Sequence, residues 1–500
     1  MTPRTELLAA TLPLVLLLAA CTVGPDYHRP PPASPPPAHY TELPGWTPAA
    51  PADTAPKGDW WTEFHDPLLD QLEPQVRIAN QTIRADYYNY QQALALVRQA
   101  DAALFPTIGA TGSATRSKAR IGLTSGSAAV AGPSYTVNQG TVEGTLTWDL
   151  DIWGKLRRTI EENAANAQAS EATLANATLS AQVTLATTLI NLRVTDANID
   201  LLTKTVTDYT EYLRVVTNAV TAGYNLYPPS DEVTARVQLE NTRASLIALS
   251  VARAQYVHAI AVLVGKNPED LDITPTTTIP TLPQIPVGVP STLLQRRPDI
   301  AAAERTMAAQ NAAIGVAMAA YYPDISLSAA FGVAQTPLSK LFQAANEIWS
   351  IGATGSETLF DFGARAAQVA EAKAAYEAAV ATYRGTVLSA FQGVEDNLAA
   401  LRILAQQGVA LEAASRDAKR GAQIARNEYL AGTADYTTVA TAQATELADE
   451  QNALAVQQSR LVDAANLIGD LGGGWSDAQL HDAQHPNNTA PLQTQASAPP

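Results

Sequence analysis

The period of the apolar and polar positions changes at two prolines. Before Pro323 the chain is rich in alanine, as in a helix, and after it the stretch DISLSAAFG alternates apolar and polar residues as a strand does. The stretch AALFPTIGATG makes the same change at Pro106. The pattern therefore predicts that two helices each run directly into a strand region.

The body of the chain repeats itself at a fixed offset. In four matched pairs the two residues lie 209 positions apart: Gly154 and Gly363, Leu179 and Leu388, Leu192 and Leu401, and Gly223 and Gly432. Because the offset is constant, no net insertion separates the two copies over this length. Pro106 and Pro323 lie 217 positions apart, so about eight residues were gained or lost in the strand region. The offset indicates two structural repeats.

Each repeat has the same predicted order: a helix, two short strands, a very long helix, a tight turn and a second helix. We expect the helices at residues 81–104, 154–222 and 230–264 in the first repeat, and at 298–321, 363–430 and 435–471 in the second. A helix of about 70 residues would be roughly 105 Å long. Because the shorter helices together match the long one in length, we expect two adjacent rods per repeat, one continuous and one broken where the strands depart.

One face of each strand region is apolar and the other is polar. From Val142 to Leu150, apolar residues alternate with Glu143, Asp149 and threonines, so one face suits lipid and the other suits water. Aromatic residues near the strand ends fit the girdle of a membrane barrel: Trp148, Trp153, Trp349 and Phe360. Candidate lumen residues are Glu143, Asp149 and Asp324. Two surface hairpins that cap a helical bundle would give a similar alternation.

The number of strands decides what a membrane role would require. Spanning barrels begin at eight strands, and an open sheet edge in lipid leaves backbone groups unpaired. Four strands in one chain therefore cannot close a barrel. A membrane role would need several copies of the chain, with four strands from each.

Composition narrows the class of protein. Only 16% of the residues are charged and the net charge is -16, which disfavours binding to nucleic acid. With one cysteine, no disulfide can form within the chain, so packing must hold the fold. No stretch after Cys21 has the roughly 18 consecutive apolar residues of a spanning helix.

The only cysteine, Cys21, ends the apolar stretch LLAATLPLVLLLAAC. This stretch is typical of a signal peptide, and the small or aliphatic residues before the cysteine resemble a bacterial lipobox. That resemblance implies a covalent diacylglycerol and an N-acyl chain on Cys21, and no other cofactor is expected. Thr22 in place of aspartate favours sorting to the outer membrane. The alternative is a chance cysteine after an ordinary signal peptide.

Several longer stretches resemble the TolC-like outer membrane factors, in the lipoprotein (NodT/OprM-type) branch that serves resistance-nodulation-division efflux systems. The matching stretches are CTVGPDYHRP, WWTEFHDPLLDQL, WDLDIWGKLRR, RRPDIAAAERTMAAQNAAIGVAMAAYYPDISLSAAFG and LFDFG. The resemblance implies a mainly α fold with a small β part. Long antiparallel helical hairpins would form an α-barrel, and four strands per chain would complete a 12-stranded transmembrane β-barrel in a homotrimer.

The resemblance also divides the chain and implies its partners. The expected segments are a signal peptide (1–20), a lipidated Pro-rich tether (21–58), a first repeat (59–265), a linker in the equatorial region (266–290), a second repeat (291–471) and a disordered tail (472–500). The implied partners are a periplasmic adaptor, an inner-membrane transporter and outer-membrane lipid of a Gram-negative bacterium. Drug, metal and aromatic-compound systems share this pattern.

The family closes its tunnel at the far helical tips. By resemblance, Asp231 matches the acidic residue that begins the helix after the first turn, and Tyr429 matches the tyrosine before the second turn. The family's arginine position holds Ala434, and its constricting acidic ring falls on Thr438 and Thr441. Asp435 is a candidate for the missing charge. Both acids have a simpler interpretation at a helix start, as an N-cap in the case of Asp435.

No constellation of an enzyme is evident. Of six histidines only His258 lies well inside a predicted long helix, and no metal-ligand or triad spacing appears. The stretch VGKNPED lacks the glycine spacing of a phosphate loop. The hypothesis is therefore a passive efflux channel subunit rather than an enzyme. The alternatives are a non-conducting periplasmic coiled-coil lipoprotein scaffold and an exit duct for type I secretion.

Overall fold

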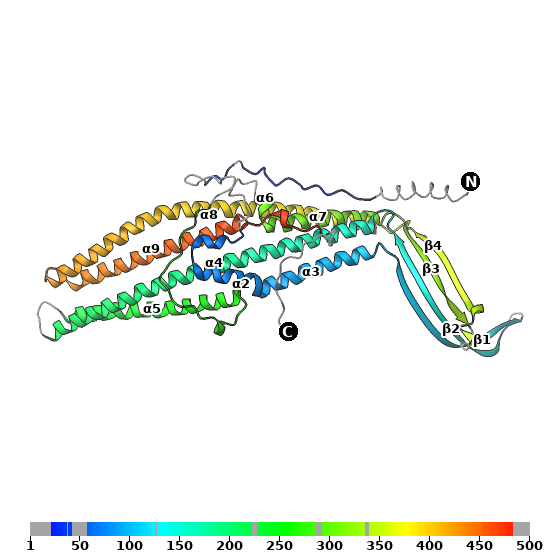
Figure 1. Cartoon of the computed structure of the whole chain (residues 1–500), viewed down its shortest axis with the longest axis horizontal. Coiled ribbons are helices and arrows are strands. Elements are labelled where there is room, and N and C mark those ends of the chain that lie inside the picture. The colour runs from blue at the N-terminus through cyan, green and yellow to red at the C-terminus, as the bar shows by residue number, and fades with distance from the viewer. Residues whose placement is uncertain are drawn as a thin grey trace.

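The structure is a computed structural model that describes residues 22–37, 39–42, 58–125, 128–222, 228–285, 293–335 and 340–483. The predicted signal peptide, Cys21 and residues 223–227 of the first turn lie outside the described residues. Figure 1 shows an elongated bundle of helices with one sheet extending from its end. The predicted fold class, mainly helical with a small four-stranded part, is confirmed.

Both repeats share the order helix, strand, strand, long helix, helix, and each has short additional helices of its own. The first contains η2 (Trp60–Phe64), α2 (Pro67–Ala79), α3 (Gln81–Ala102), β1 (Thr107–Ser125), β2 (Ala128–Leu150), α4 (Lys155–Thr221) and α5 (Pro229–Leu263). After η3 (Pro268–Asp270) come α6 (Leu293–Arg296), α7 (Pro298–Ala319), β3 (Asp324–Gln335), η6 (Ala344–Asn346), β4 (Glu347–Ser356), α8 (Ala364–Leu430), α9 (Tyr436–Asp470) and η7 (Asp477–Gln479). The six predicted helices end within about two residues of the observed bounds.

The rods exist as predicted, but the predicted position of the break is wrong. In the first repeat α4 is the continuous rod, and α5 and α3 pack along it. The break lies between α5 and α3, where the Asn80 side chain donates to the Leu263 carbonyl oxygen (3.0 Å) and caps α3. In the second repeat Arg297 bridges α7 to the end of α9, with 3.0 Å from its Nη1 to the Asp470 carbonyl oxygen. Both breaks therefore lie midway along the rods, and the strands leave from the other end of α3 and α7.

Both long helices begin at a glycine in the left-handed region. Gly154 has φ 81° and Gly363 has φ 92°, a conformation that disfavours any side chain with a Cβ. At Gly154 a Cβ would also lie 2.5 Å from Cγ2 of Thr22. These two positions, which share the repeat offset, turn the chain from the strands into the rods.

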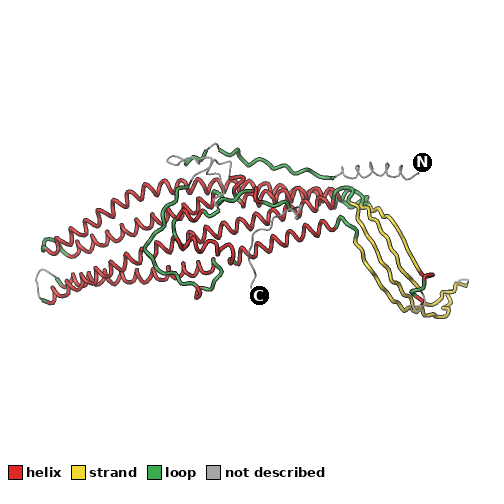
Figure 2. Tube along the Cα trace, in the orientation of Figure 1, coloured by secondary structure: helices red, strands yellow, loops and turns green. Residues whose placement is uncertain are grey.

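The four strands form one antiparallel sheet in the order β1-β2-β3-β4. Figure 2 shows this sheet, in yellow, extending beyond the end of the helices. The two hairpins join because β2 pairs with β3, from Gly140 opposite Gln335 to Leu150 opposite Ile325. The expectation of short strands is wrong for the first hairpin, whose strands have 19 and 23 residues against 12 and 10 in the second. Within the described chain, β1 and β4 each pair on one side only.

The core lies where the rods, α2 and the N-terminal segment meet. Its fully buried members include Phe64, Leu185 and Leu189. An ion pair is buried beside it, with Arg193 Nε 2.8 Å from Oδ2 of Asp66, the residue that caps α2. This region fixes the long helices at their middle, so that their free ends extend away from the core.

Two segments predicted to be loose are attached to the bundle. The residues after Cys21 run extended along α7 and α8, and Asn311 donates to the carbonyl oxygen of Pro25 (2.9 Å). The predicted disordered tail is ordered up to residue 483, because the backbone N–H of His481 donates to Glu171 (3.0 Å) and Ala483 is buried. Residues 484–500 lie outside the described residues.

Among the described helices, α5 alone is long and apolar enough, by length and composition, to cross a membrane. Only 11% of its most apolar window is buried, and it packs as a rod against α4. Its exposed apolar side chains include Val237, Ile247 and Val251. This stripe therefore lies on the surface of the single chain.

Candidate functional site at the helical tips

The helix pairs α4–α5 and α8–α9 both end at the end of the bundle opposite the sheet (Figure 1). A small buried cluster joins them there, with its members drawn from all four helices: Tyr212, Val216, Ala235, Ala425, Tyr429, Tyr436 and Val439. The cluster lies far from the core at the middle of the rods. The closure of the tips therefore depends on a few local contacts.

The structure brings together two of the predicted tip residues. The hydroxyl of Tyr429, on α8, donates to Oδ2 of Asp231, in the first turn of α5, over 3.2 Å. Asp231 is only 8% exposed. Its side chain is therefore not simply a helix cap: it holds the first repeat to the second.

The environment of Asp231 disfavours its charged form. Burial raises the pKa of this carboxyl above its usual value, and the negative charge of Asp435 adds to the rise. The hydrogen bonds from Tyr429 and Ser230 act in the opposite direction but do not cancel it. The closed tip therefore favours a protonated Asp231 more than an open, hydrated tip would.

A second bridge was not predicted from the sequence. The hydroxyl of Tyr436, at the start of α9, donates to Oε1 of Gln238 on α5 (3.2 Å), and Nε2 of Gln238 donates to the carbonyl oxygen of Ala440 (3.4 Å). We call Tyr436, Gln238 and Ala440 the clasp. The sequence did contain a signal for this second bridge. Tyr429 and Tyr436 are seven positions apart, and so are their acceptors Asp231 and Gln238.

The tyrosine rings pack together beside these hydrogen bonds. Tyr212 of α4 stacks on Tyr436 with ring centroids 5.2 Å apart, and Tyr429 lies 5.7 Å from Tyr436. Packed aromatic rings of this kind bury apolar area and favour offset or edge contacts. Three of the four helices thus contribute a ring to one cluster.

The other predicted gate residues have local roles. Asp435 caps α9, accepting from the backbone N–H of Thr438 (2.9 Å) and from its hydroxyl (2.7 Å), and these bonds lower the pKa of Asp435. Thr441 is exposed and donates to the carbonyl oxygen of Thr437 within the same helix. Neither Asp435 nor the two threonines bridges the repeats in the described chain, although their role in constricting a pore stays a prediction.

The sheet register places the three lumen candidates on one face. Glu143 is opposite Gly332, Asp149 is opposite Ser326, and Asp324 has the same parity as Ser326 on β3. On the opposite face Leu146 pairs with Ala329, which pairs with Ile351. The predicted separation of a polar face from an apolar one is therefore present across strands from both repeats.

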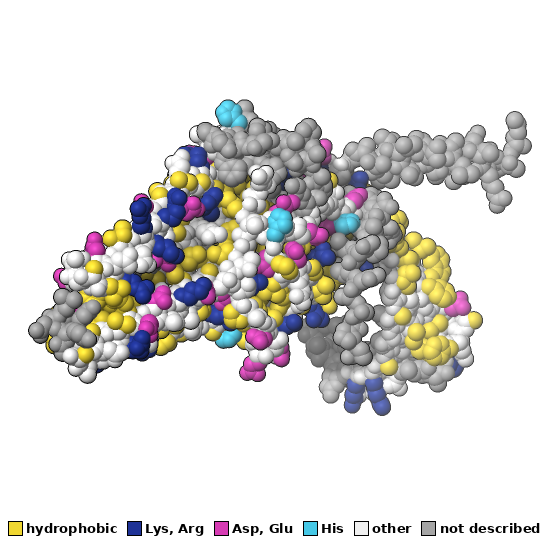
Figure 3. Space-filling model, turned by 60° about the vertical axis from the view of Figure 1, so that its left-hand side comes forward, with side chains coloured by type: hydrophobic (Ala, Val, Ile, Leu, Met, Phe, Trp, Pro, Cys, Tyr) yellow, Lys and Arg dark blue, Asp and Glu magenta, His cyan; other side chains and the backbone are white. Residues whose placement is uncertain are grey.

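The apolar face is exposed in the single chain. Ile108 is 81% exposed, Ile351 80% and Trp349 73%, and Figure 3 shows apolar side chains gathered on the sheet. Trp148 and Trp153 lie at the end of the sheet next to the helices, where their indole N–H groups donate to the carbonyl oxygens of Leu104 (2.8 Å) and Pro323 (2.9 Å).

The described part of the N-terminal segment begins beside these tryptophans, at the junction of the sheet and the helices. The backbone N–H of Val23 donates to the carbonyl oxygen of Trp153 (3.0 Å), three residues beyond the end of β2. Arg158 holds the segment there by donating to the carbonyl oxygen of Val23 and to Asp26. Cys21, although itself outside the described residues, is thus two residues from a fixed point at the junction of sheet and helices.

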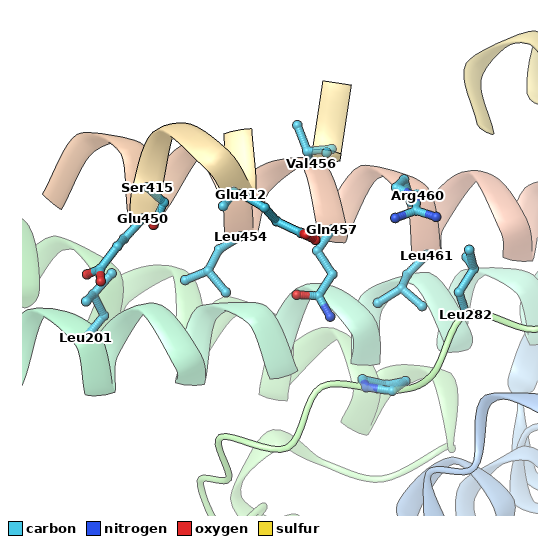
Figure 4. A pocket seen from close by; sticks show the side chains of 13 residues that line it. Leu201, Leu282, Glu412, Ser415, Glu450, Leu454, Val456, Gln457, Arg460 and Leu461 are labelled. Carbon is cyan, nitrogen blue, oxygen red and sulfur yellow. The ribbon is translucent and has the colours of Figure 1, made fainter. Parts of the chain in front are cut away.

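A cavity of about 460 Å³ lies between α8, α9 and α4, and Pro280 and Leu282 of the linker line one side of it (Figure 4). Leu201 and Leu454 give it apolar walls, and Glu412, Glu450 and Arg460 add charged groups of both signs. Among the described residues no group of histidine, cysteine, aspartate or glutamate side chains has the arrangement of a metal site. The cavity therefore offers a surface of mixed apolar and charged character.

Comparison with known proteins gives a consistent result. The sequence model of the family described as outer membrane efflux protein matches residues 72–266 and 289–473. The chain is 30% identical to the probable efflux pump outer membrane protein TtgC of Pseudomonas putida, over 92% of this chain and 94% of that protein. It is 28% identical to the cation efflux system protein CusC of Escherichia coli, over 92% and 97%. The structure of the outer-membrane channel OprN aligns with a TM-score of 0.83 at 28% identity, covering 91% of this chain and all of that one.

Proposed function

The chain belongs to the outer membrane efflux protein family, and on that premise we propose that three copies of it form the channel that an efflux pump uses to cross the outer membrane. Solutes would pass from an inner-membrane transporter and a periplasmic adaptor into the helical tunnel and leave through a twelve-stranded barrel. In this proposal the subunit conducts passively and does no chemistry.

The observation that carries the proposal is the single four-stranded sheet with opposed faces and unpaired outer strands. In the described chain β1 and β4 end the sheet, and unpaired backbone groups of this kind are costly in hydrocarbon. Three sheets joined edge to edge would leave no such edge. Glu143, Asp149 and Asp324 would then line the lumen, and the exposed apolar face would meet lipid.

The exposed apolar stripe on α5 supports assembly from several copies. Val237, Ile247 and Val251 are each more than half exposed in the single chain, and an apolar face of this length on a rod favours a neighbouring helix. A ring of three chains would cover the stripe with rods of the next copy. The helical part would then form a closed wall around the tunnel.

We also propose that Cys21 carries the predicted acyl chains. The support is the position of the residues that follow it, since Val23 is fixed beside Trp153 at the junction of the sheet and the helices. Acyl chains attached at that level would enter the inner leaflet next to the barrel. The aromatic residues at the junction fit the same boundary.

The test is the electrical conductance of the purified protein in planar lipid bilayers. We expect trimers that insert and conduct in discrete steps, with a larger open fraction when the tip contacts are weakened. A protein that binds membranes through its lipid but does not conduct, even with altered tips, would favour the non-conducting scaffold. Export of a protein substrate in place of small solutes would favour the type I secretion duct.

A further inference from the structure

The first hairpin carries cations on its apolar face, beyond the point where the apolar residues end. β1 pairs with β2 in unbroken register from Thr107 opposite Thr147 to Arg120 opposite Ser134. Even-numbered positions of β1 therefore lie on one face together with Leu146 of β2. Near the helices this face holds Ile108, which is 81% exposed.

Farther along the same face are Arg116 and Lys118. They pair with Asn138 and Thr136 of β2, and both side chains are exposed. Figure 3 shows basic side chains gathered at the end of the sheet that is farthest from the helices, next to the apolar patch. The face thus changes from apolar to cationic along a single strand.

The change occurs at the height where a membrane would end. The last row shared by three strands joins Ala114, Gly140 and Gln335, and Arg116 lies two residues beyond it. From Ile108 to Arg116 the strand rises about 27 Å, or about 21 Å along the membrane normal at a tilt of about 40°. The apolar band of such barrels is about 25 Å tall. The cations therefore lie at the outer boundary of the hydrocarbon.

The local charge is opposite to that of the whole chain. Residues 102–142 contain no aspartate or glutamate and hold three cations, while the chain as a whole carries a net charge of -16. The nearest acid on β2 is Glu143, which lies on the other face. In the second hairpin, residues 324–356, the sequence has one cation, Lys340, and two acids, Asp324 and Glu347. Hence the outer end of β1 presents uncompensated positive charge.

We propose that Arg116 and Lys118 form a binding site for the phosphorylated headgroups of lipids in the outer leaflet. The inference rests on the proposed function, since only a closed barrel turns this face toward lipid. Arginine can bind phosphate oxygens through two parallel N–H donors, and lysine contributes a compact charge. One lipid would place its acyl chains along Ile108 and its neighbours and its phosphate against the two cations.

The test compares lipid binding by the full-length protein and two double variants in detergent. The probe is lipid A with both phosphates, against the same lipid without phosphate, and native mass spectrometry measures bound lipid per trimer. One variant is R116Q/K118Q. The matched control is T115Q/S117Q, which changes the neighbouring positions on the opposite face of the same strand.

We expect wild type and control to prefer the phosphorylated lipid, and R116Q/K118Q to lose about 25-fold in apparent affinity for it. That loss corresponds to about fivefold for each cation near an anionic surface. Binding of the lipid without phosphate should not change. An R116Q/K118Q protein that keeps the preference would overturn the inference, and so would an equal loss for both lipids.

The conductance of the same samples separates this inference from the proposed function. If the wild type conducts and R116Q/K118Q retains the lipid preference, only the headgroup site is wrong. If R116Q/K118Q keeps the lipid preference but forms a less heat-resistant trimer, the cations serve contacts between copies, which also refutes the site. A wild type that inserts no channel would remove the premise and refute both.

Discussion

Replacing Tyr429 by phenylalanine removes one hydroxyl and keeps the ring in its cluster. The variant deletes the 3.2 Å hydrogen bond to Asp231, the contact between α8 and α5 at the tip. Because Asp231 is 8% exposed, water cannot freely replace the lost donor while the tip stays closed. In an open tip the carboxylate would be hydrated. The substitution therefore acts against the closed state.

The size of the effect follows from the burial of the acceptor. Removing a hydrogen-bond donor from a buried acceptor costs about 1–3 kcal/mol, and the remaining hydrogen bond from Ser230 places Asp231 toward the lower end of this range. A difference of that size changes the ratio of closed to open tips by about 5- to 150-fold for each subunit. In the proposed trimer, which has three tips, a concerted opening would include this change once for each subunit. The aromatic contacts with Tyr212 and Tyr436 persist and limit the effect.

The assay is the open fraction of reconstituted trimers in planar bilayers, together with uptake of bulky antibiotics by cells that carry the variant. Tyr429→Phe should raise both. Asp231→Ala should raise the leak too, because it removes the acceptor. The matched control is Tyr376→Phe, which deletes the hydroxyl of a partly buried tyrosine on the same helix, far from the tip.

The pH dependence has a definite sign. Burial raises the pKa of Asp231 in the closed tip, so the closed state binds a proton more tightly than the hydrated open state. Closure is therefore most stable at low pH and weakens as the pH rises through the raised pKa. Asp231→Asn should remove this dependence. If Tyr429→Phe leaves conductance and uptake unchanged while the trimer is intact, the hydrogen bond between Tyr429 and Asp231 does not hold the tip closed, and the reasoning is refuted.

Three further predictions test other parts of the structure. Val142→Lys places a charge on the apolar face midway between the rows of Ile108 and Arg116, and should cost roughly 2–4 kcal/mol near midplane, seen as a lower yield of heat-resistant trimer; a normal yield would contradict the strand register. Cys21→Ala should abolish metabolic labelling with palmitate, and persistent labelling would refute the lipid assignment. Arg193→Ala should lower the unfolding free energy by about 3–5 kcal/mol, because it leaves Asp66 buried without its partner. Burial alone would raise the pKa of Asp66, but Arg193 and the backbone N–H groups of Leu68 and Leu69 together outweigh it, and the pKa is lowered. The pair should therefore stabilise the wild type above the usual carboxyl range and lose this effect on acidification. Equal stability of the variant and wild type in denaturant melts at neutral pH would argue against this.

The features that could be predicted from the sequence are those that depend on local patterns. Alternation along β2 and β3 identified the polar and apolar faces, since neighbouring side chains on a strand point to opposite sides. The turn into each long helix was visible as Gly154 and Gly363, because a left-handed residue at a tight turn favours glycine. The N-cap role of Asp435 follows from the same kind of local chemistry.

The features that were missed depend on contacts between distant segments. The break in the rods lies where α5 meets α3, and Asn80 and Leu263 are far apart in the sequence. The clasp of Tyr436 with Gln238 likewise joins two repeats. The long first hairpin is rich in glycine, serine and alanine, which have weak strand preference, so pairing between β1 and β2 decides its length.

The central claim is that the four-stranded sheets of three copies join edge to edge. Its most direct test is high-resolution imaging of the purified full-length protein in lipid nanodiscs. We expect a threefold ring in which β1 of one copy pairs with β4 of the next and a water-filled passage runs from the barrel to the helical tips. A single chain with both outer strands unpaired, or an assembly without a passage, would contradict the account.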